Sequence, residues 1–274
     1  MAEMECPPIG AVIEECVESK RFSNRRPRYI DELARLLRRF CSDLEDLPLS
    51  FFTARDIENW LAANTATPGS RKTAINRLSA LFSFARRRGY VEANPLARIE
   101  QVSIEARPPR IFSPNDADRF MNTVRIVAPS LLPDAVLGLY AGIRSAELER
   151  LDWSCIDLDR GLVRIDAAAS KVRRRRLVPL EPKAKLLLDG LQGMPIAVRH
   201  YRKLHPRRRI AEAMEWPEIP HNILRHSAAS YLLALHRDAG KVALMLGNSP
   251  GILLSVYYEL VSPDDCAKFW ACKG

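Results

Sequence analysis

The sequence predicts a mainly α-helical protein of two domains, with a small β-hairpin or sheet element in the second. Three observations predict this class. Apolar residues recur at helical spacing over most of the chain, the stretch 161–181 changes to strand-like runs, and a charged, proline-containing connector lies near 102–112. A chain of 274 residues is long enough for two modest domains. We expect a helical domain over 1–105, a linker over 106–112 and a second domain over 113–274.

Three stretches predict the helices of the first domain: 28–44, 53–64 and 69–90. Residues 28–44 carry an apolar stripe at helical spacing with charged residues elsewhere, and 69–90 are a longer amphipathic stretch. Thr53 is a plausible N-cap of the second helix, and the Arg-Arg-Arg-Gly sequence that ends at Gly89 is typical of a helix end. The first domain is therefore predicted to be all-helical.

The second domain continues with helices from Ser113. In "GLVRIDAAASKVRRRRLVPLE" (161–181) two β-rich runs flank a segment of small residues, a pattern that suggests a hairpin-like element. The rest of the domain, 181–274, is again predicted to be mostly helical. No internal repeat or low-complexity tract is visible in the chain.

Charge and composition narrow the class of partner. A formal charge of +9 and a pI of about 9.4 favour a polyanion, either nucleic acid or an acidic membrane surface. The 6 cysteines contain no CxxC pair, so a reduced intracellular compartment is a simpler interpretation than disulfides or a zinc site. The N-terminus is acidic and interrupted by prolines, unlike a signal peptide, and the longest apolar run (126–143) carries Asp134 and two prolines. These features favour a cytoplasmic protein that does not span a membrane.

Basic residues cluster at 21–28, 85–89, 171–176 and 205–209. Any one cluster is typical of a solvated face, but four clusters over both halves favour an extended DNA-contacting surface. The residues predicted to contact DNA are Arg25, Arg26, Arg86, Arg87, Arg173, Arg175, Arg207 and Arg208.

Several stretches carry residues that suit phosphate chemistry. Arg144 follows a small-residue turn, and Glu147 lies three residues later on the same helical face, where it can hold the guanidinium. Lys171 precedes a strand, and Arg225 stands in the first turn of a helix with Asn222 one turn earlier. Each also has an ordinary interpretation: an exposed helical arginine, a solvated lysine at a hairpin tip, or an asparagine N-cap.

The order of these stretches is more specific than any one of them. "AGIR", then a lysine before "RLVPL", then "NILRH", then "LGNSPGILLSVY" resembles the tyrosine recombinase (phage integrase) family. The resemblance covers nearly the whole chain, because that family also begins with a helical DNA-clamping domain. It implies a catalytic second domain of tyrosine recombinase type.

The resemblance assigns roles residue by residue. Arg144 and Arg225 match the two catalytic arginines, and Lys171 matches the hairpin lysine. Tyr257 matches the nucleophile, because it has the usual family spacing from the "LGN" motif, and Tyr258 is then its neighbour.

Two positions depart from the family pattern. Asn222 stands where the family usually has His or Lys, and Asn248 where it has His or Trp. Asparagine can donate a hydrogen bond to a phosphate oxygen but cannot shuttle a proton. His221 is displaced by one residue, although a helix extended by one residue would bring it onto the face of Arg225.

The implied chemistry is cleavage and rejoining of DNA through a 3′-phosphotyrosyl intermediate. Two guanidiniums stabilise the charge that develops on the phosphate, and the lysine supplies a proton to the departing 5′ oxygen. No metal is required, and the absence of a Walker A motif means that ATP is not implied. We therefore expect a site-specific recombinase or integrase that needs no cofactor and works on double-stranded DNA as a homotetramer on two duplexes.

Alternatives remain at this stage. A type IB topoisomerase shares the chemistry but relaxes DNA without sequence choice, and a catalytically lapsed integrase would only bind DNA. A helical basic protein unrelated to catalysis is the third alternative. The C-terminal segment 263–274 either docks on a neighbouring protomer through Phe269 and Trp270 or packs on its own domain.

Overall fold

The structure, a computed structural model, describes residues 6–104, 108–166, 175–196, 200–257 and 261–272. The chain divides into two compact units, Met1–Ala106 and Arg107–Gly274. The fold is mostly helical, as the sequence predicts, and each unit has its own apolar core.

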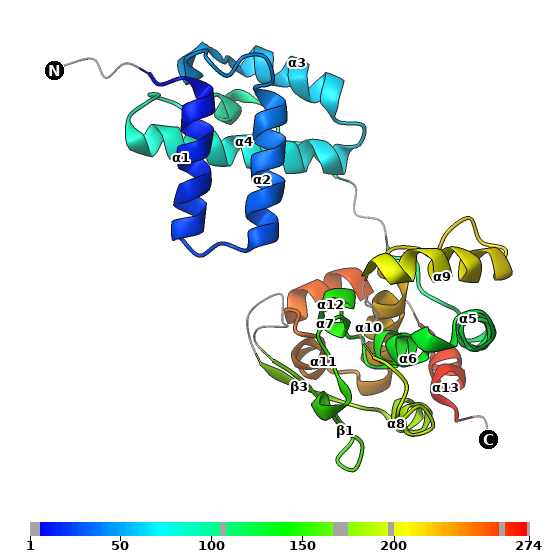
Figure 1. Cartoon of the computed structure of the whole chain (residues 1–274). Coiled ribbons are helices and arrows are strands. Elements are labelled where there is room, and N and C mark those ends of the chain that lie inside the picture. The colour runs from blue at the N-terminus through cyan, green and yellow to red at the C-terminus, as the bar shows by residue number, and fades with distance from the viewer. Residues whose placement is uncertain (1–5, 105–107, 167–174, 197–199, 258–260, 273–274) are drawn as a thin grey trace. The chain divides into compact units, whose positions relative to one another are not determined.

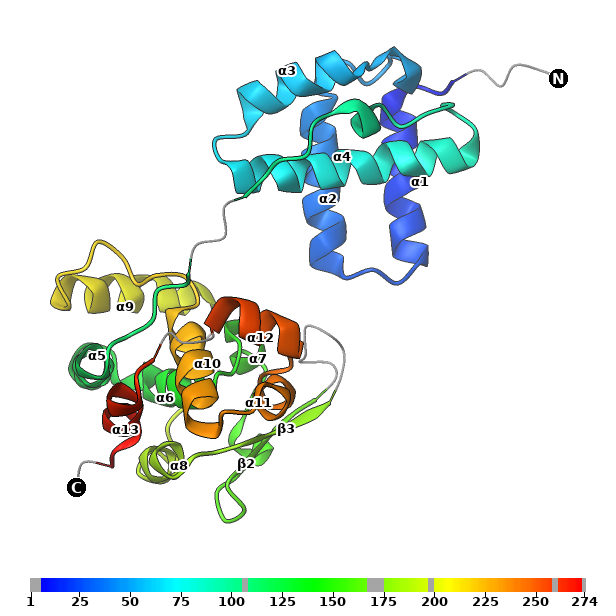
Figure 2. The same ribbon diagram turned by 180° about the vertical axis from the view of Figure 1, so that it is seen from behind.

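The first unit is all-helical in its described part. Helices α1 and α2 lie side by side, and α4 crosses both of them (Figures 1 and 2). The bounds are α1 Ile9–Phe22, α2 Pro27–Phe40, α3 Ala54–Asn64 and α4 Pro68–Arg88, with the short 3-10 helices η1 Leu49–Phe51 and η2 Pro95–Arg98.

Local sequence explains where these helices begin and end. The Thr53 side chain accepts from the backbone N–H of Asp56, and the Asp56 carboxylate accepts from that of Thr53, so the predicted N-cap of α3 is confirmed as a reciprocal capping box. Gly89 ends α4 with a φ of 79°, a left-handed conformation that a glycine adopts without steric cost.

The second unit carries the small sheet among its helices. Its helices are α5 Pro114–Val127, α6 Leu132–Tyr140, α7 Ser145–Leu148, α8 Pro182–Asp189, α9 His200–Ala213, α10 Ile223–His236, α11 Ala239–Leu246, α12 Pro250–Tyr257 and α13 Pro263–Trp270, with the 3-10 helices η3 Pro129–Leu131 and η4 Trp153–Cys155. Its strands in the described part are β1 Ile156–Asp157, β2 Leu162–Ile165 and β3 Arg176–Pro179.

The predicted hairpin element is present as the antiparallel pair β2 and β3. The register places Val163 opposite Val178 and Ile165 opposite Arg176, and β1 adds a strand on the other side of β2 that the sequence pattern did not indicate. Because side chains alternate along a strand, Arg176 points to the same face as the buried Val178. Strand β3 contacts α11 (Figure 2). The Arg176 side chain is 9% exposed, so β3 delivers an arginine into the interior.

Helix α10 lies at the centre of the second unit and contacts α6, α11, α12 and α13. Helix α10 also binds Phe112, in the segment through which the chain enters this unit, by two hydrogen bonds. The backbone N–H of Phe112 donates to Ser227 Oγ at 2.8 Å, and the Tyr231 hydroxyl donates to the Phe112 carbonyl at 3.0 Å. Phe112, the last residue of the predicted linker, is thus part of the core of the second unit.

Helix α13 packs on its own domain, the second of the two alternatives stated for the C-terminal segment. Phe269 is 1% exposed and stacks on Tyr231 with ring centroids 3.7 Å apart. The Trp270 indole N–H donates to the Tyr231 carbonyl at 3.2 Å. Both aromatic anchors are therefore used within the chain.

Among the described residues, no single helix is long and apolar enough to cross a membrane. Helices α11 and α12 would together be long and apolar enough, but they are bent by 105° at their junction.

Candidate active site

A tight turn between α6 and α7 places Arg144. Gly142 has a φ of 63°, and a Cβ at this position would lie 2.4 Å from Leu246 Cδ2 and 3.2 Å from Ala228 Cβ. Only glycine satisfies both the left-handed backbone and this close approach. The turn leads directly into the N-cap position of α7, which Arg144 occupies.

Arg144 is held by three kinds of oxygen. Its Nη1 donates to Glu147 Oε1 at 3.0 Å, and its Nη2 donates to the Gly247 carbonyl at 2.7 Å and to Asn248 Oδ1 at 2.8 Å. The backbone N–H of Arg144 donates to Glu147 Oε2 at 3.1 Å. The carboxylate therefore fixes both the main chain and the side chain of this arginine.

Glu147 also binds a second arginine. Arg176, 9% exposed, donates from Nη1 and Nη2 to the two oxygens of Glu147 at 3.0 and 2.7 Å, and its Nε donates to the Met245 carbonyl at 2.9 Å. Burial acts to raise the pKa of Glu147, which is 1% exposed, but the hydrogen bonds and charges of Arg176 and Arg144 outweigh it and lower the pKa. The carboxylate is therefore ionised at neutral pH and tethers two guanidiniums.

Arg225 enters the same cluster from the first turn of α10, as predicted. Its Nη1 donates to the Gly142 carbonyl, and its Nη2 donates to the Leu246 carbonyl at 2.7 Å and to Asn248 Oδ1 at 3.1 Å. Burial, together with the charge of Arg144, lowers the pKa of Arg225 to about 9. The guanidinium is still cationic at pH 7.

Asn248 joins the two arginines. Its Oδ1 accepts from Arg144 and from Arg225, and guanidinium groups are donors only, so the oxygen of this amide must face them. The amide NH₂ remains the donor group of the side chain. The carbonyl oxygen of this amide therefore links the two guanidiniums.

Tyr257 lies at the end of α12 and is 6% exposed. Its hydroxyl is 2.8 Å from His226 Nδ1 on α10, and the two rings are tilted at 36°. Burial raises the pKa of Tyr257, while Arg225 and Arg144 act to lower it. Tyr258 lies outside the described residues.

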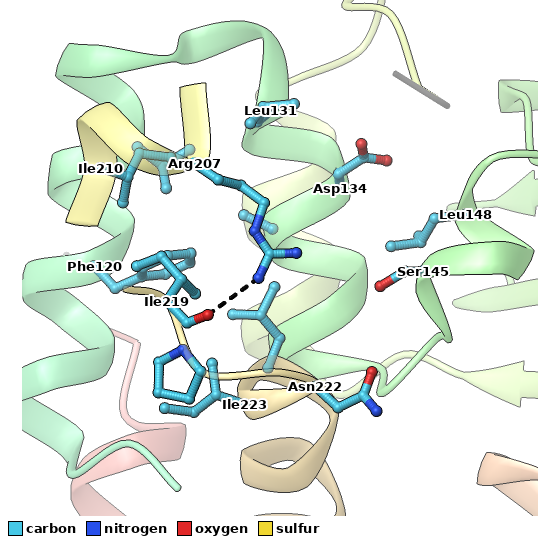
Figure 3. A pocket seen from close by; sticks show the side chains of 14 residues that line it. Phe120, Leu131, Asp134, Ser145, Leu148, Arg207, Ile210, Ile219, Asn222 and Ile223 are labelled. Carbon is cyan, nitrogen blue, oxygen red and sulfur yellow. Dashed lines mark hydrogen bonds between the residues drawn. The ribbon is translucent and has the colours of Figure 1, made fainter. Parts of the chain in front are cut away.

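Asn222 occupies the N-cap position of α10 with a left-handed backbone (φ 57°) and makes no side-chain capping hydrogen bond. Helix α10 begins at Ile223, so it does not extend back to His221, which is exposed. Asn222 and Ser145 instead line one cavity of about 90 Å³, bounded by α5, α6, α9 and α10 (Figure 3).

The predicted DNA-contacting arginines fall into different settings. Arg25, Arg26, Arg86, Arg87, Arg175 and Arg208 are exposed. Arg207 differs, because its guanidinium points into the cavity of Figure 3 and Nη2 donates to the Ile219 carbonyl at 3.2 Å. Burial lowers the pKa of Arg207, in keeping with this inward position. Lys171 and Arg173 lie outside the described residues.

Sequence reasoning did not assign Arg176 or His226 to the site. For Arg176 a signal existed, because the two-residue period with Val178 places this member of the Arg run on the buried face of β3. For His226 the adjacency to Arg225 was visible, but its meeting with Tyr257 depends on how α12 packs against α10. Within the described ranges, no group of three or more His, Cys, Asp or Glu side chains is placed to hold a metal ion.

Comparison with known proteins extends these observations to the whole chain. No protein-family profile matches the sequence. A "Tyrosine recombinase XerC" of Mycobacterium bovis (strain BCG / Pasteur 1173P2) is 31% identical over 276 residues, covering 88% of this chain and 91% of the relative. The XerC of Xylella fastidiosa (strain 9a5c) is 28% identical over 229 residues, covering 74% of this chain and 75% of the relative.

Two solved structures share the fold at low sequence identity. The Tn1549 transposon integrase in complex with circular intermediate DNA has a TM-score of 0.74 at 13% identity and covers 94% of this chain and 97% of its own. The lambda integrase tetramer bound to a Holliday junction has a TM-score of 0.71 at 18% identity and covers 88% and 74%. With the arginine pair, the tyrosine and the relatives in agreement, the chain belongs to the tyrosine recombinase family.

Proposed function

We propose that this tyrosine-type site-specific recombinase cuts and rejoins strands of double-stranded DNA with Tyr257 as its nucleophile. The observation that carries the proposal is the convergence of three separate segments. Arg144 and Arg225 share Asn248 Oδ1, and Tyr257 lies against the residue that follows Arg225. Transfer of a phosphodiester to a protein requires a nucleophile, here a phenol. It also requires fixed cations, here two guanidiniums, that stabilise the charge on the phosphate.

The chemical steps follow from these groups. Tyr257 Oη attacks the phosphorus of the scissile phosphate, forms a 3′-phosphotyrosyl bond and loses its proton. The bond from phosphorus to the 5′ oxygen breaks, and that oxygen takes a proton from Lys171, the proposed general acid. Arg144 and Arg225 donate hydrogen bonds to the non-bridging oxygens as their negative charge grows. Ligation reverses the sequence with the 5′ hydroxyl of the partner strand.

The two asparagines have different settings in this proposal. Asn248 orients both arginines through its oxygen and can donate from its NH₂ group to a phosphate oxygen. Asn222 lines the cavity beside Ser145, from which its amide can donate to the DNA backbone. Neither residue can move a proton, so proton transfer is assigned to other side chains.

We also propose that different segments of the chain have different roles. Residues 1–105 form a core DNA-binding domain, 106–112 a linker, and 113–274 the catalytic domain. Arg25, Arg26, Arg86 and Arg87 of the first domain, with Arg173, Arg175 and Arg208 of the second, supply phosphate contacts. Arg207 is left out of this set because its guanidinium is directed into the cavity.

The working assembly is proposed to be a homotetramer on two DNA duplexes. The fold neighbour described as a lambda integrase tetramer bound to a Holliday junction supports this stoichiometry. Sedimentation of the protein with a synthetic four-way junction should give a species of four protomers, whereas a limit of one or two protomers would count against the tetramer.

A suicide duplex with a nick near the cleavage site tests the nucleophile. Wild-type protein should form a covalent DNA adduct that survives a denaturing gel, with the linked peptide containing Tyr257. Tyr257→Phe should form none, whereas Tyr258→Phe should retain it, because the hydroxyl that lies beside His226, the neighbour of Arg225, is that of Tyr257. Adduct from Tyr257→Phe but not from Tyr258→Phe would reverse the assignment.

The arginine pair is tested in the same assay. Arg225→Ala should abolish the adduct yet leave DNA affinity within about tenfold, because many other basic residues contact phosphates. Cleavage at the wild-type rate by Arg225→Ala would remove this residue from the site.

A further inference from the structure

The hydroxyl of Tyr257 has a hydrogen-bond partner, and that partner is a base. His226 Nδ1 lies 2.8 Å from Tyr257 Oη, although the two residues are 31 positions apart in the chain. The contact joins the start of α10 to the end of α12, two helices that pack against each other. It is therefore a product of the fold rather than of local sequence.

Tyr257 needs such a partner. Burial raises its pKa, and the nearby charges of Arg225 and Arg144 oppose this effect without reversing it. The phenol is therefore neutral at physiological pH and must lose its proton as it attacks phosphorus. Arg225 and Arg144 are donors only, so neither can accept that proton.

His226 is in the right protonation state to act. Burial lowers its pKa, and the charges of Arg225 and His221 lower it further. Its ordinary pKa is about 6.5, so the ring is neutral at pH 7. The charged and titratable groups that act on this ring are Arg225 and His221 on its N-terminal side and Tyr257 on α12.

We propose that His226 is the general base that accepts the proton of Tyr257 during strand cleavage and returns it during ligation. The inference rests on the proposed role of Tyr257 as nucleophile. The Oη–H bond breaks as the Oη–P bond forms, and the proton moves to Nδ1, which requires the tautomer with its proton on Nε2. The 5′ oxygen leaves with a proton from the separate acid, so the two transfers balance.

The test compares two kinds of variant in single-turnover cleavage of the suicide duplex. His226→Asn keeps an acceptor oxygen near the position of Nδ1 but has no basicity, so it separates proton transfer from positioning. We expect cleavage to slow by about 100-fold or more, with DNA affinity and melting temperature close to wild type. His226→Gln serves in place of His226→Asn if the latter loses its melting transition.

Three further readouts distinguish a base from a structural residue. The wild-type rate should fall as pH drops through the pKa of His226, below about 6.5, and the variant should lack this limb. Replacing Tyr257 by a fluorinated tyrosine of lower pKa should restore much of the rate of His226→Asn. A 5′-bridging sulfur, which leaves without a proton, should rescue Lys171→Ala but not His226→Asn.

Two results would overturn the inference. Cleavage by His226→Asn within about threefold of wild type would show that no base acts at this position. A slow variant with an unchanged pH profile and no rescue by fluorotyrosine would make His226 a positioning residue. Failure of the proposed function is separate, because wild-type protein would then form no adduct at Tyr257 at all.

Discussion

Single side chains of the site show how a cluster of positive charge is held together without DNA. Arg144, Arg176 and Arg225 donate to carbonyl, carboxylate and amide oxygens supplied by α7, α11 and the turns beside them. One buried carboxylate, that of Glu147, sits between two of the three guanidiniums. The donors are therefore fixed before a phosphate arrives, and little reorganisation is needed during the reaction.

Arg176 should act by positioning Glu147, and Arg176→Lys tests this. A lysine keeps the charge but cannot bind both carboxylate oxygens in the planar geometry of a guanidinium. We expect cleavage to slow by about 10- to 100-fold through displacement of Arg144, with DNA affinity little changed. Arg164→Lys, at an exposed position on the paired strand β2, is the matched control and should cleave normally. Equal rates for the two variants would exclude the positioning role.

Glu147 should make the stability of the folded protein depend on pH in the acid range. Its pKa is lowered in the folded protein, so its contribution is complete above the ordinary glutamate pKa of about 4.3 and is lost as pH falls through the folded value. Calorimetry of wild type and Glu147→Gln should show a gap in melting temperature at pH 6 that narrows towards pH 3. A gap that is constant over this range would mean that the charge of Glu147 is not the source of the stabilisation.

Two glycine turns orient the site at the scale of secondary-structure elements. Gly142 follows α6 and Gly247 follows α11, both with a φ of 63°. Their carbonyls accept from Arg225 and Arg144, respectively. Left-handed residues turn the chain sharply, so each helix ends with an acceptor directed at a guanidinium from another element.

Gly142→Ala should disturb this arrangement. The new methyl group would meet Leu246 and Ala228 in a backbone conformation that alanine adopts poorly, at a cost of about 2–4 kcal/mol in unfolding free energy. The adduct yield should fall because the carbonyl acceptor of Arg225 is displaced. Gly251→Ala, where a Cβ would meet no atom within 4 Å, is the control and should be neutral or slightly stabilising. Equal stability of the two variants would refute the argument.

The whole molecule carries its positive charge on both units. The net charge is +9, and exposed arginines lie at Arg25, Arg26, Arg86 and Arg87 in the first unit and at Arg175 and Arg208 in the second. Affinity from phosphate contacts is independent of sequence and falls steeply with salt, because counterions are released on binding. Specific cleavage and general affinity are thus expected to depend on different residues.

The salt dependence of DNA binding tests whether the exposed arginines supply the general affinity for DNA. Replacing Arg86 and Arg87 together by alanine should reduce the slope of log K against log salt by about 0.9 for each lost phosphate contact. Arg38→Ala is the control, because Arg38 donates to both oxygens of Glu14. An unchanged slope in the double variant would place these two arginines away from the DNA.

The sequence by itself determined the local elements and indicated most residues of the candidate site. Capping at Thr53, the helix end at Gly89 and the hairpin over 161–181 depend on neighbours within a few positions, so short-range patterns contain them. The mainly helical class follows from the same periodicity. Arg144 and Arg225 were recognisable because their motifs occur in the family order.

Tertiary structure alone decided which side chains meet. Arg176 and Glu147 are 29 residues apart, and His226 and Tyr257 are 31 apart, so neither contact is encoded in a local period. The same holds for Arg207, which shares a basic cluster with the exposed Arg208 but turns into the interior. Such pairings are decided by how α10, α11, α12 and β3 pack, because burial forces each polar group to find a partner from whichever element lies opposite.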